Sequence, residues 1–314
     1  MSQPPHLPLL LVVVGPTGAG KSELALALAR KFGGEIVNCD SIQVYRGLDI
    51  GSAKTPLGLR QGIPHHLLDI ASIDVEVTAG DFARLGRAAL GEITSRGALP
   101  VVVGGTGFYL RALLEGLSEA PTRSHALRAR LARIAERRPS ALHRLLTKRD
   151  PSAAARIHAN DHQKLIRAVE IIVLTGKPVS TVQARPREPL TGFRILKIGL
   201  SPPRSALYER LNERTIQMFT GGLVAETGRI LDAGYSPNLK PLQSLGYKQA
   251  LDVVSGKRSV ESAITECQLR TRQYAKRQIT WFRADSEITW FSGFGFEPGI
   301  QVASATFVAS SLLP

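Results

Sequence analysis

Short aliphatic runs alternate with helix-like stretches along this chain. Runs of this length between amphipathic segments are typical of strands that are buried on both faces of a parallel sheet. The alternation predicts an α/β fold with a mainly parallel sheet flanked by helices on both faces. We expect strands over Leu9–Val14, Glu35–Cys39, Pro100–Val103, Arg194–Leu200 and Glu287–Phe291.

Other parts of the chain have the period of helices instead. We expect helices over Ser205–Thr220, Leu223–Ala233 and Val260–Phe282, whereas the tail beyond Gly293 has no clear pattern. Between Pro121 and Pro189 the sequence is rich in Arg and Ala and has no strand pattern. We therefore expect an α/β core, 1–120 plus 190–314, and an all-helical insertion domain, 121–189.

A glycine-rich segment joins the first expected strand to the first helix. It consists of Gly15, Pro16, Thr17, Gly18, Ala19, Gly20, Lys21 and Ser22. Its glycines allow successive N–H groups to face one anion, and the helix that follows adds the positive end of its dipole. The ammonium of Lys21 suits terminal phosphates, and the hydroxyl of Ser22 can ligate Mg²⁺. The segment predicts a phosphate-binding loop of the P-loop type, the alternative being a glycine turn that only connects strand to helix.

The charge balance indicates a polyanionic partner. The 314 residues include 40 Lys and Arg against 26 Asp and Glu, a net charge of +14. Nine of the basic residues lie between Arg123 and Arg149, beside the single acid Glu136, which makes this stretch a candidate clamp for a nucleic-acid backbone. A solvated basic face without a partner is the alternative.

Cysteine usage and hydropathy restrict the compartment. Cys39 and Cys267 are far apart in the sequence and have no ligand spacing around them, which supports neither a disulfide framework nor a zinc site. The apolar run Leu7–Val14 is too short to span a bilayer. We therefore expect a cytoplasmic protein without a membrane or targeting segment.

Two further polar clusters follow strands, at the edge where a parallel sheet binds its ligands. Asp40 follows the second strand and either holds Mg²⁺ through water or acts as a general base. The run Val101–Val103 ends in glycine instead of a second acid, which favours the base. A helix N-cap is the plain alternative for Asp40. Thr106 follows the next strand and either steers a nucleophile or belongs to an ordinary turn.

The helix over 205–220 carries an arginine on its apolar stripe. Arg214 lies among Leu207, Leu211 and Met218, with Arg210 one turn earlier. A guanidinium in such a place needs an anion, because burying it unpaired is costly. A diphosphate would serve, and Glu209 or Glu213 on the same helix is the alternative.

The segment after Asn160 predicts a helix that ends at Gly176. Its apolar positions Leu165, Val169, Ile172 and Val173 share one face, and Gln163 and Arg167 lie together on the other. That polar pair suits a base edge or a phosphate, unless Arg167 pairs with Glu170.

The last long helix carries aromatic and basic residues on one side, Arg270, Tyr274, Arg277 and Trp281. This combination suits a nucleic-acid groove with stacking positions, although an aromatic stripe is also typical of a core. His65 and His66 have no ligand spacing, and we expect them in a polar turn.

These motifs, taken in their order along the chain, resemble those of the bacterial tRNA dimethylallyltransferases, also called tRNA isopentenyltransferases. The resemblance extends from Leu10 to about Phe291. It is carried by Gly15–Ser22, Asp40–Arg46, Asp49–Lys54, Ile63–Asp69, Gly104–Leu110, Asn160–Glu170, Gln243–Lys248 and Ala275–Gln278.

The resemblance implies transfer of a dimethylallyl group from dimethylallyl diphosphate to N6 of the adenosine 3′ to the anticodon, position 37, of tRNA. It implies Mg²⁺ as cofactor and the tRNA anticodon stem-loop as partner. It also implies that the protein is a monomer and does not associate with a membrane. The catalytic residues it implies are Asp40 as proton acceptor, Thr106 as the group that positions the amine, and Lys21 as a cation for the departing diphosphate.

The resemblance also assigns binding residues. Diphosphate would contact Gly15, Pro16, Thr17, Gly18, Ala19, Gly20, Lys21, Ser22 and Arg214, with Ser22 also on the metal. tRNA would contact Asp40, Ser41, Ile42, Gln43, Thr106, Arg128, Gln163, Lys164, Leu165, Ile166, Arg167, Gln243, Ser244, Leu245, Gly246, Tyr247, Lys248, Lys276 and Arg277. The family usually has an arginine where this chain has Gly228, and Arg229 is one residue along.

Two other functions share parts of this pattern. An isopentenyltransferase that acts on free AMP, ADP or ATP would have the same loop and Asp40, but would leave the basic insertion without a role. A P-loop kinase or a nucleotide-dependent RNA-binding switch would bind ATP and transfer or hydrolyse its phosphate.

Overall fold

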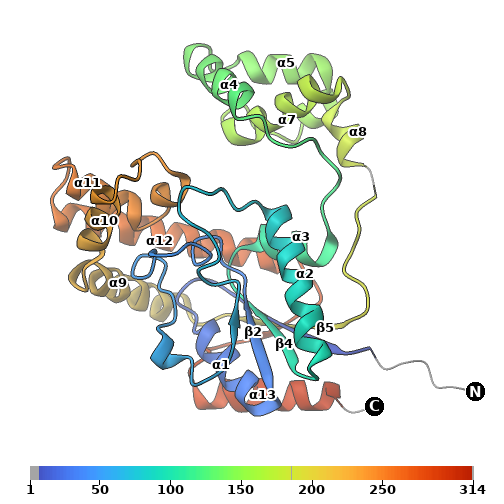
Figure 1. The fold of residues 1–314 in the computed structure, drawn as a ribbon, viewed down its shortest axis with the longest axis vertical. Helices are drawn as coiled ribbons and strands as arrows, with labels where there is room; N and C mark the ends of the chain where they lie inside the picture. The colour runs from blue at the N-terminus through green and yellow to red at the C-terminus, as the bar shows by residue number, and fades with distance from the viewer. Residues whose placement is uncertain (1–6, 185, 313–314) are drawn as a thin grey trace, which may run out of the picture. The chain divides into compact units, whose positions relative to one another are not determined.

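The computed structural model describes residues 7–184 and 186–312, and its centre is a six-stranded sheet (Figure 1). Every strand pair is parallel, and the strand order is β3-β2-β4-β1-β5-β6. The predicted α/β class is confirmed. The strands are β1 (Leu9–Val14), β2 (Gly34–Asn38), β3 (His65–His66), β4 (Leu99–Val103), β5 (Arg194–Leu200) and β6 (Ile288–Phe291).

The short edge strand β3 corrects the sequence-based expectation of a polar turn. His65 and His66 pair in parallel with Ile36 and Val37 of β2. The imidazole Nε2 of His66 lies 2.6 Å from a carboxylate oxygen of Glu35. A strand of two polar residues shows no alternation of apolar side chains, so its pairing is visible only in the fold.

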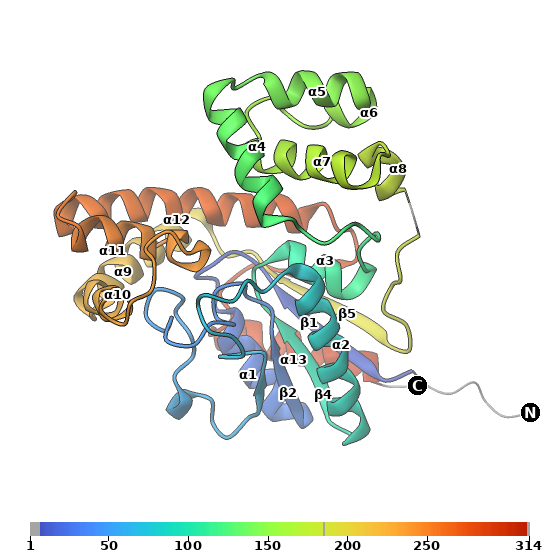
Figure 2. The ribbon, with the colours of Figure 1, turned by 45° about the horizontal axis from the view of Figure 1, so that its top comes forward.

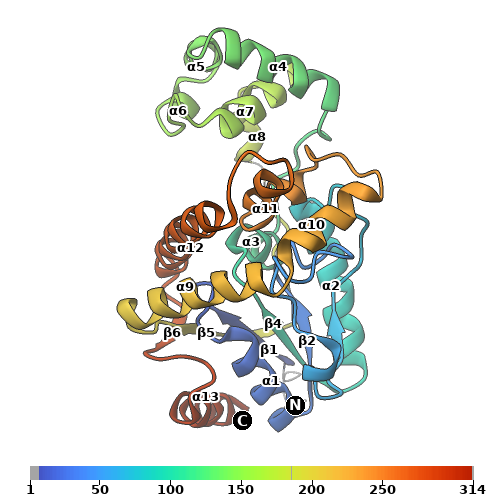
Figure 3. The same cartoon turned by 90° about the vertical axis from the view of Figure 1, so that its left-hand side faces the viewer.

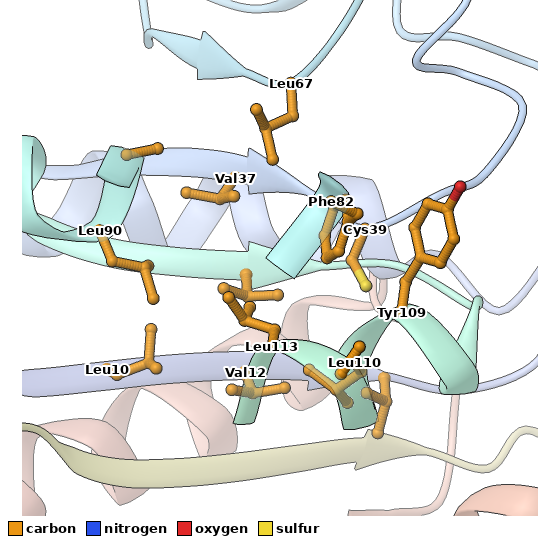
Figure 4. Packing of buried hydrophobic residues seen from close by; sticks show 14 of the residues in the cluster. Leu10, Val12, Val37, Cys39, Leu67, Phe82, Leu90, Tyr109, Leu110 and Leu113 are labelled. Atoms are coloured by element: carbon orange, nitrogen blue, oxygen red, sulfur yellow. The ribbon is translucent and has the colours of Figure 1, made fainter. Parts of the chain in front are cut away.

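Alternate residues of β1 face two different cores. Leu10 and Val12 pack with side chains of α2 (Ala79–Ser95) and α3 (Gly107–Glu115), among them Phe82 and Leu113 (Figure 4). Leu11 and its alternate neighbours pack on the opposite face, against α1 (Lys21–Phe32) and α13 (Pro298–Leu312). The sheet is therefore covered by helices on both faces, as the aliphatic strands predict.

Helix α13 lies beside α1 (Figure 3), although the sequence of the tail gave no clear pattern. It mixes small and apolar residues around its whole circumference, and buries only Ser304, Ala305 and Val308. Because it has no separate polar face, the helical period is not visible in its sequence.

The helices after β5 form a third core with the loops between β2 and α2. Helices α9 and α12 run in contact with each other, as do α10 and α11. Their buried side chains pack with Val44, Tyr45 and Leu48. The elements are η1 (Leu57–Leu59) in the loop, and α9 (Arg204–Thr220), α10 (Leu223–Asp232), η2 (Lys240–Gln243), α11 (Tyr247–Val254) and α12 (Val260–Arg283).

A second compact unit comprises Glu115–Pro189, and the rest of the chain forms the first unit. The second unit contains five helices within its described residues (Figure 2). They enclose their own apolar core, which includes Leu131, Leu146 and Leu165. The helices are α4 (His125–Arg137), α5 (Ala141–Arg149), α6 (Pro151–Ala154), α7 (His162–Thr175) and α8 (Val179–Gln183).

Helix α7 ends as the sequence predicts, with Gly176 in the left-handed conformation at φ 70°. Its apolar face is rotated from the expected one. Val173 is 56% exposed, whereas Ala168 and Ile171 are buried. Val173, Ala168 and Ile171 are all apolar, so only the packing of the neighbouring helices decides which of them lies inward.

No helix within residues 7–184 and 186–312 combines the length and the apolar composition that crossing a bilayer requires.

Candidate active site

The glycine-rich segment forms a tight loop between β1 and α1. Gly20 is the N-cap of α1 and has φ 83°, a conformation that strains any residue with a Cβ. A Cβ there would also lie 2.7 Å from the backbone nitrogen of Gly295. The ammonium of Lys21 donates to the carbonyl oxygen of Pro16, at 2.8 Å. The loop therefore closes around the start of α1, where backbone N–H groups have no partner within the helix.

A buried glutamine of α12 connects this loop to the turn after β4. The side-chain oxygen of Gln278 accepts from the backbone N–H of Thr17, at 2.8 Å. Its side-chain nitrogen donates to the carbonyl oxygen of Gly105, at 2.9 Å. Gln278 belongs to the motif Ala275–Gln278, but the sequence gives no sign of its role, because its hydrogen-bond partners are far away along the chain.

Two arginines of α9 approach the loop. Arg214 donates to the hydroxyl of Thr17, at 3.4 Å, and Arg210 donates to the carbonyl oxygen of Gly18, at 3.1 Å. Arg210 also lies 3.5 Å from the carboxylate of Glu23. Among the described residues, Arg214 makes no ion pair with Glu209 or Glu213, so the alternative of an intrahelical pair does not occur.

Burial and mutual repulsion act on the cations of this site. Burial, together with the charge of Arg214, lowers the pKa of Lys21 to about 8. Burial likewise lowers the pKa of Arg214. Both cations therefore have unfavourable surroundings in the free protein, and an anion bound between them would relieve that cost.

Asp40 lies directly after β2, at the carboxyl edge of the sheet. One of its carboxyl oxygens, Oδ1, accepts from the backbone N–H of Ile42 at 2.8 Å and of Gln43 at 3.3 Å. The residues that follow form a turn, so the expected alternative of a helix N-cap is wrong. The other oxygen, Oδ2, has no hydrogen bond within the described part of the chain and is available to accept a proton.

Thr106 connects the turn of Asp40 to the turn after β4. Its hydroxyl accepts from the backbone N–H of Ser41 at 3.1 Å, and its own N–H donates to the carbonyl oxygen of Cys39. Tyr274 of α12 is close by. Burial and the charge of Asp40 raise the pKa of the Tyr274 hydroxyl, and a hydrogen bond with Thr106 lowers it in part. Asp40, Thr106 and Tyr274 thus form one polar group.

Two cavities meet at Asp40. The first, of about 850 Å³, is lined by the phosphate loop, including Lys21 and Ser22. The second, of about 540 Å³, is lined by residues of α9, α11 and α12 and by the segment before α11. Five residues line both cavities, namely Thr17, Asp40, Ser52, Arg214 and Tyr274. The carboxyl of Asp40 is therefore accessible from two separate spaces.

Most of the expected RNA contacts in the first unit lie along the second cavity. Its lining includes Ser41, Ile42, Gln243, Ser244, Leu245, Gly246, Lys248 and Arg277. Gln43 lines the first cavity instead, whereas Thr106 and the exposed Lys276 line neither. Tyr247 is fully buried, so a contact between its side chain and RNA is excluded.

The remaining expected RNA contacts belong to the second unit, on α4 and α7. Leu165 is fully buried in the core of that unit and cannot contact RNA through its side chain. Gln163 and Lys164 are exposed, whereas Ile166 packs against the same core. Of residues 163–166, only Gln163 and Lys164 have exposed side chains.

The two arginines expected on RNA share a buried carboxylate. Glu170, with no exposed surface, lies 2.7 Å from Arg167 and 3.2 Å from Arg128, and it also accepts from the N–H of Ser124 at 2.8 Å. The alternative of an Arg167–Glu170 pair is therefore correct. Each arginine side chain remains 29% exposed, which leaves room for a second, outer contact.

We expect Glu170→Gln to destabilise the protein at neutral pH by about 3 kcal/mol, because it leaves two arginines without their shared anion. Burial raises the pKa of Glu170, but hydrogen bonds from Arg167, Ser124 and Arg128 outweigh it and hold the pKa below 4.5. A carboxyl with a lowered pKa stabilises the fold above its unfolded-state pKa and loses that effect as pH falls through its folded-state pKa. Urea unfolding should therefore show a difference at pH 7 that shrinks below about pH 4.5. A difference that is constant with pH would contradict the charged pair.

Gly228 lies in α10 with open space where a side chain would be. The fold therefore tolerates the arginine usual in the family at this position, and its absence is not forced by packing.

Fold and site together define an α/β protein with a tight glycine-rich loop between β1 and α1 and a carboxyl at the junction of two cavities. The family described as IPP transferase matches residues 43–285, and the isopentenyl transferase family matches residues 8–68. The chain is 52% identical over 303 residues to a tRNA dimethylallyltransferase of Solibacter usitatus, covering 96% of this chain and 99% of the relative. It is 53% identical over 305 residues to one of Koribacter versatilis, covering 97% and 99%. The chain belongs to the IPP transferase family and is a prenyltransferase.

Solved structures agree with this assignment. The tRNA isopentenylpyrophosphate transferase of Bacillus halodurans superposes with a TM-score of 0.72 at 37% identity, covering 97% of this chain and 96% of that one. A eukaryotic dimethylallyltransferase acting on tRNA superposes with a TM-score of 0.79 at 30% identity, covering 97% and 78%. The predicted resemblance is confirmed.

Proposed function

We propose that this protein transfers the dimethylallyl group of dimethylallyl diphosphate to N6 of adenosine 37 in tRNA and releases diphosphate. The observation that carries the proposal is the position of Asp40, where a cavity lined by the phosphate loop meets a second cavity with a basic lining. Donor and acceptor can then reach one carboxyl from different sides. The relatives named above act on tRNA according to their names, which supports the same acceptor here.

The donor diphosphate would occupy the loop. The backbone N–H groups at the start of α1 would bind its oxygens, together with Lys21 and Arg214. As the carbon–oxygen bond breaks, negative charge grows on the diphosphate, and these fixed cations stabilise it. Both already line the first cavity and are partly buried, so little reorganisation is needed during the reaction.

Mg²⁺ fits the chemistry of this cavity. The hydroxyl of Ser22 and the carboxyl of Asp40 line the same space, and Mg²⁺ prefers oxygen ligands and retains several waters. The described residues contain no cluster of three or more His, Cys, Asp or Glu that would hold a metal by themselves. Ser22 would therefore share the ion with diphosphate oxygens and water. When bound, the ion supplies further positive charge to the leaving group.

The acceptor adenine would enter through the second cavity. Its exocyclic nitrogen N6 forms the new bond to C1 of the prenyl group while the C1–oxygen bond to diphosphate breaks. The proton that N6 loses goes to Oδ2 of Asp40, and the hydroxyl of Thr106 orients the amine. An adenine within a stacked loop has to be flipped out to reach this position.

The anticodon stem-loop would lie along the basic residues. Lys248, Arg270 and Arg277 line the second cavity, and the second unit contributes the arginine-rich helices α4 and α5. A cytoplasmic location, where tRNA is available, is part of the proposal. An isopentenyltransferase for free AMP would leave this basic lining without a ligand.

The proposal is tested by incubating the protein with labelled dimethylallyl diphosphate and either tRNA or free AMP. We expect label in tRNA, at N6 of adenosine 37, and none in AMP. Labelled AMP would support the adenylate alternative. Transfer of the γ-phosphate from ATP, in a parallel reaction, would support a kinase.

tRNA affinity should fall steeply with salt, because bound basic side chains release counterions from the phosphate backbone. With Z phosphate contacts, the logarithm of the association constant falls with a slope of about −0.7 to −0.9 times Z against the logarithm of salt concentration. We expect a slope of about −4 or steeper from filter binding between 50 and 300 mM KCl. A flat response would contradict a backbone clamp.

A further inference from the structure

Glu226 is a buried acid of α10 that lines neither cavity, although it contacts a loop that lines both. Its carboxyl accepts from the backbone N–H of Asp49 at 3.3 Å and of Ile50 at 3.0 Å. It also accepts from the hydroxyl of Tyr247, at 2.5 Å. A buried carboxyl is stable only when its oxygens have donors, and here the loop supplies two of them.

Tyr247 of α11 holds the next residue of the same loop. Its hydroxyl oxygen accepts from the backbone N–H of Gly51, at 3.2 Å. A Cβ on Gly51 would lie 2.6 Å from the tyrosine ring, so only glycine allows this approach. Three successive N–H groups, 49–51, are thus held by two buried side chains from elsewhere in the sequence.

The loop continues to the turn that contains Asp40. The side-chain nitrogen of Gln43 donates to the carbonyl oxygens of Ser52, at 3.0 Å, and Ala53, at 3.4 Å. The backbone N–H of Gln43 in turn donates to Oδ1 of Asp40. Hydrogen bonds and the backbone of residues 49–53 therefore connect Glu226 through Gln43 to the carboxyl of Asp40.

We propose that Glu226 and Tyr247 are positioning residues for the reaction: they fix residues 49–53, and through Gln43 they set the orientation of the Asp40 carboxyl. This inference rests on the proposed role of Asp40 as proton acceptor. It also gives Tyr247 a function behind the loop, in place of the RNA contact expected from sequence.

The test uses Glu226→Gln and Tyr247→Phe in the full-length protein. The first substitution puts an NH₂ group where a carboxylate oxygen now accepts, and the second leaves the N–H of Gly51 without its acceptor. We expect kcat for tRNA prenylation to fall about ten- to a hundredfold in each, because a small misplacement of a catalytic group is costly. The dissociation constant of the donor should change less than about twofold, since the phosphate loop is untouched.

Thr227→Val is the matched control. Thr227 is fully buried beside Glu226 on α10, but within the described residues its hydroxyl donates a hydrogen bond only to the carbonyl oxygen of Leu223 in the same helix. We expect this variant to lose some stability and to keep its kcat. An equal loss of kcat in the control would show that the effect is structural and would overturn the proposal.

A double-mutant cycle tests the path to Asp40. The kcat losses of Glu226→Gln and Gln43→Ala should be clearly less than additive, because both interrupt the same chain of hydrogen bonds. Additive losses, or an unchanged kcat in Glu226→Gln, would overturn the proposal.

Hydrogen exchange of the wild type and variants provides a readout that does not depend on activity. The amides of Ile50 and Gly51 should exchange faster in Glu226→Gln than in Thr227→Val. Equal exchange rates in these two variants would overturn the positioning role, whether or not the protein carries out the proposed reaction. Failure of wild-type prenylation, with the exchange difference present, would instead reject the proposed function.

Discussion

Asp40→Asn should nearly abolish prenyl transfer while the protein still binds both substrates. The amide keeps an oxygen that accepts from the N–H groups of Ile42 and Gln43, so the turn is preserved. It cannot take up a proton from the amine, and loss of a positioned general base typically costs 10²–10⁴-fold in rate. We expect a loss of about 10³-fold in the single-turnover rate constant, measured with labelled donor and saturating tRNA.

Asp74→Asn provides the control, because Asp74 is an exposed acid that lines neither cavity. It should transfer at the wild-type rate. If Asp40→Asn lost tRNA binding but kept its rate constant on bound substrate, Asp40 would be an RNA contact and not the proton acceptor.

Lys21→Ala should weaken donor binding and slow the transfer. The ammonium lies at the start of α1 and donates a hydrogen bond to the carbonyl oxygen of Pro16, and the partly buried side chain lines the first cavity with Arg214. Because its charge acts on the departing diphosphate, the transition state should lose more than the ground state. We expect kcat/KM for the donor to fall by about 10³-fold and kcat by about 10²-fold, from steady-state kinetics with tRNA in excess.

Lys31→Ala is matched to this variant, because Lys31 lies in the last turn of the same helix and is exposed. It should change neither parameter by more than about twofold, since exposed charges contribute little locally. Unchanged donor affinity in Lys21→Ala would place the diphosphate elsewhere. A higher KM with an unchanged kcat would mean that Lys21 binds the donor but does not assist the departure of diphosphate.

The sequence was sufficient for features that depend on neighbours in the chain. Strands β1 and β5 have the bounds that the sequence predicts. Strand β1 is apolar throughout because it is buried along its whole length, whereas β5 is buried only over its last three residues and also contains Arg194 and Lys197. The tight loop between β1 and α1 was predictable for a similar reason, since its glycines lie within eight consecutive residues. The position of Asp40 at the carboxyl edge also followed, because parallel strands bring such residues together.

Residues whose partners are distant were not predictable in the same way. The side chain of Gln278 connects Thr17 to Gly105 by hydrogen bonds. The carboxyl of Glu226 accepts from the backbone of Asp49 and Ile50. No local sequence pattern around either side chain predicts these partners. Tyr247 belongs to the recognisable motif Gln243–Lys248, but its side chain lies inside the core. A short sequence motif shows that a segment matters, but it does not show which of its side chains point inward.

By itself the sequence determined the parallel α/β class, the glycine-rich loop after the first strand, the positive charge and the likeness to tRNA-modifying prenyltransferases, because each is encoded in composition or in short contiguous stretches. Only the tertiary structure decided that two cavities meet at Asp40, that Arg128 and Arg167 share the carboxylate of Glu170, and that buried side chains support the loop over 49–53. These depend on contacts between residues far apart in the chain. Such contacts are set by how whole helices and strands pack, and no local pattern of residues specifies them.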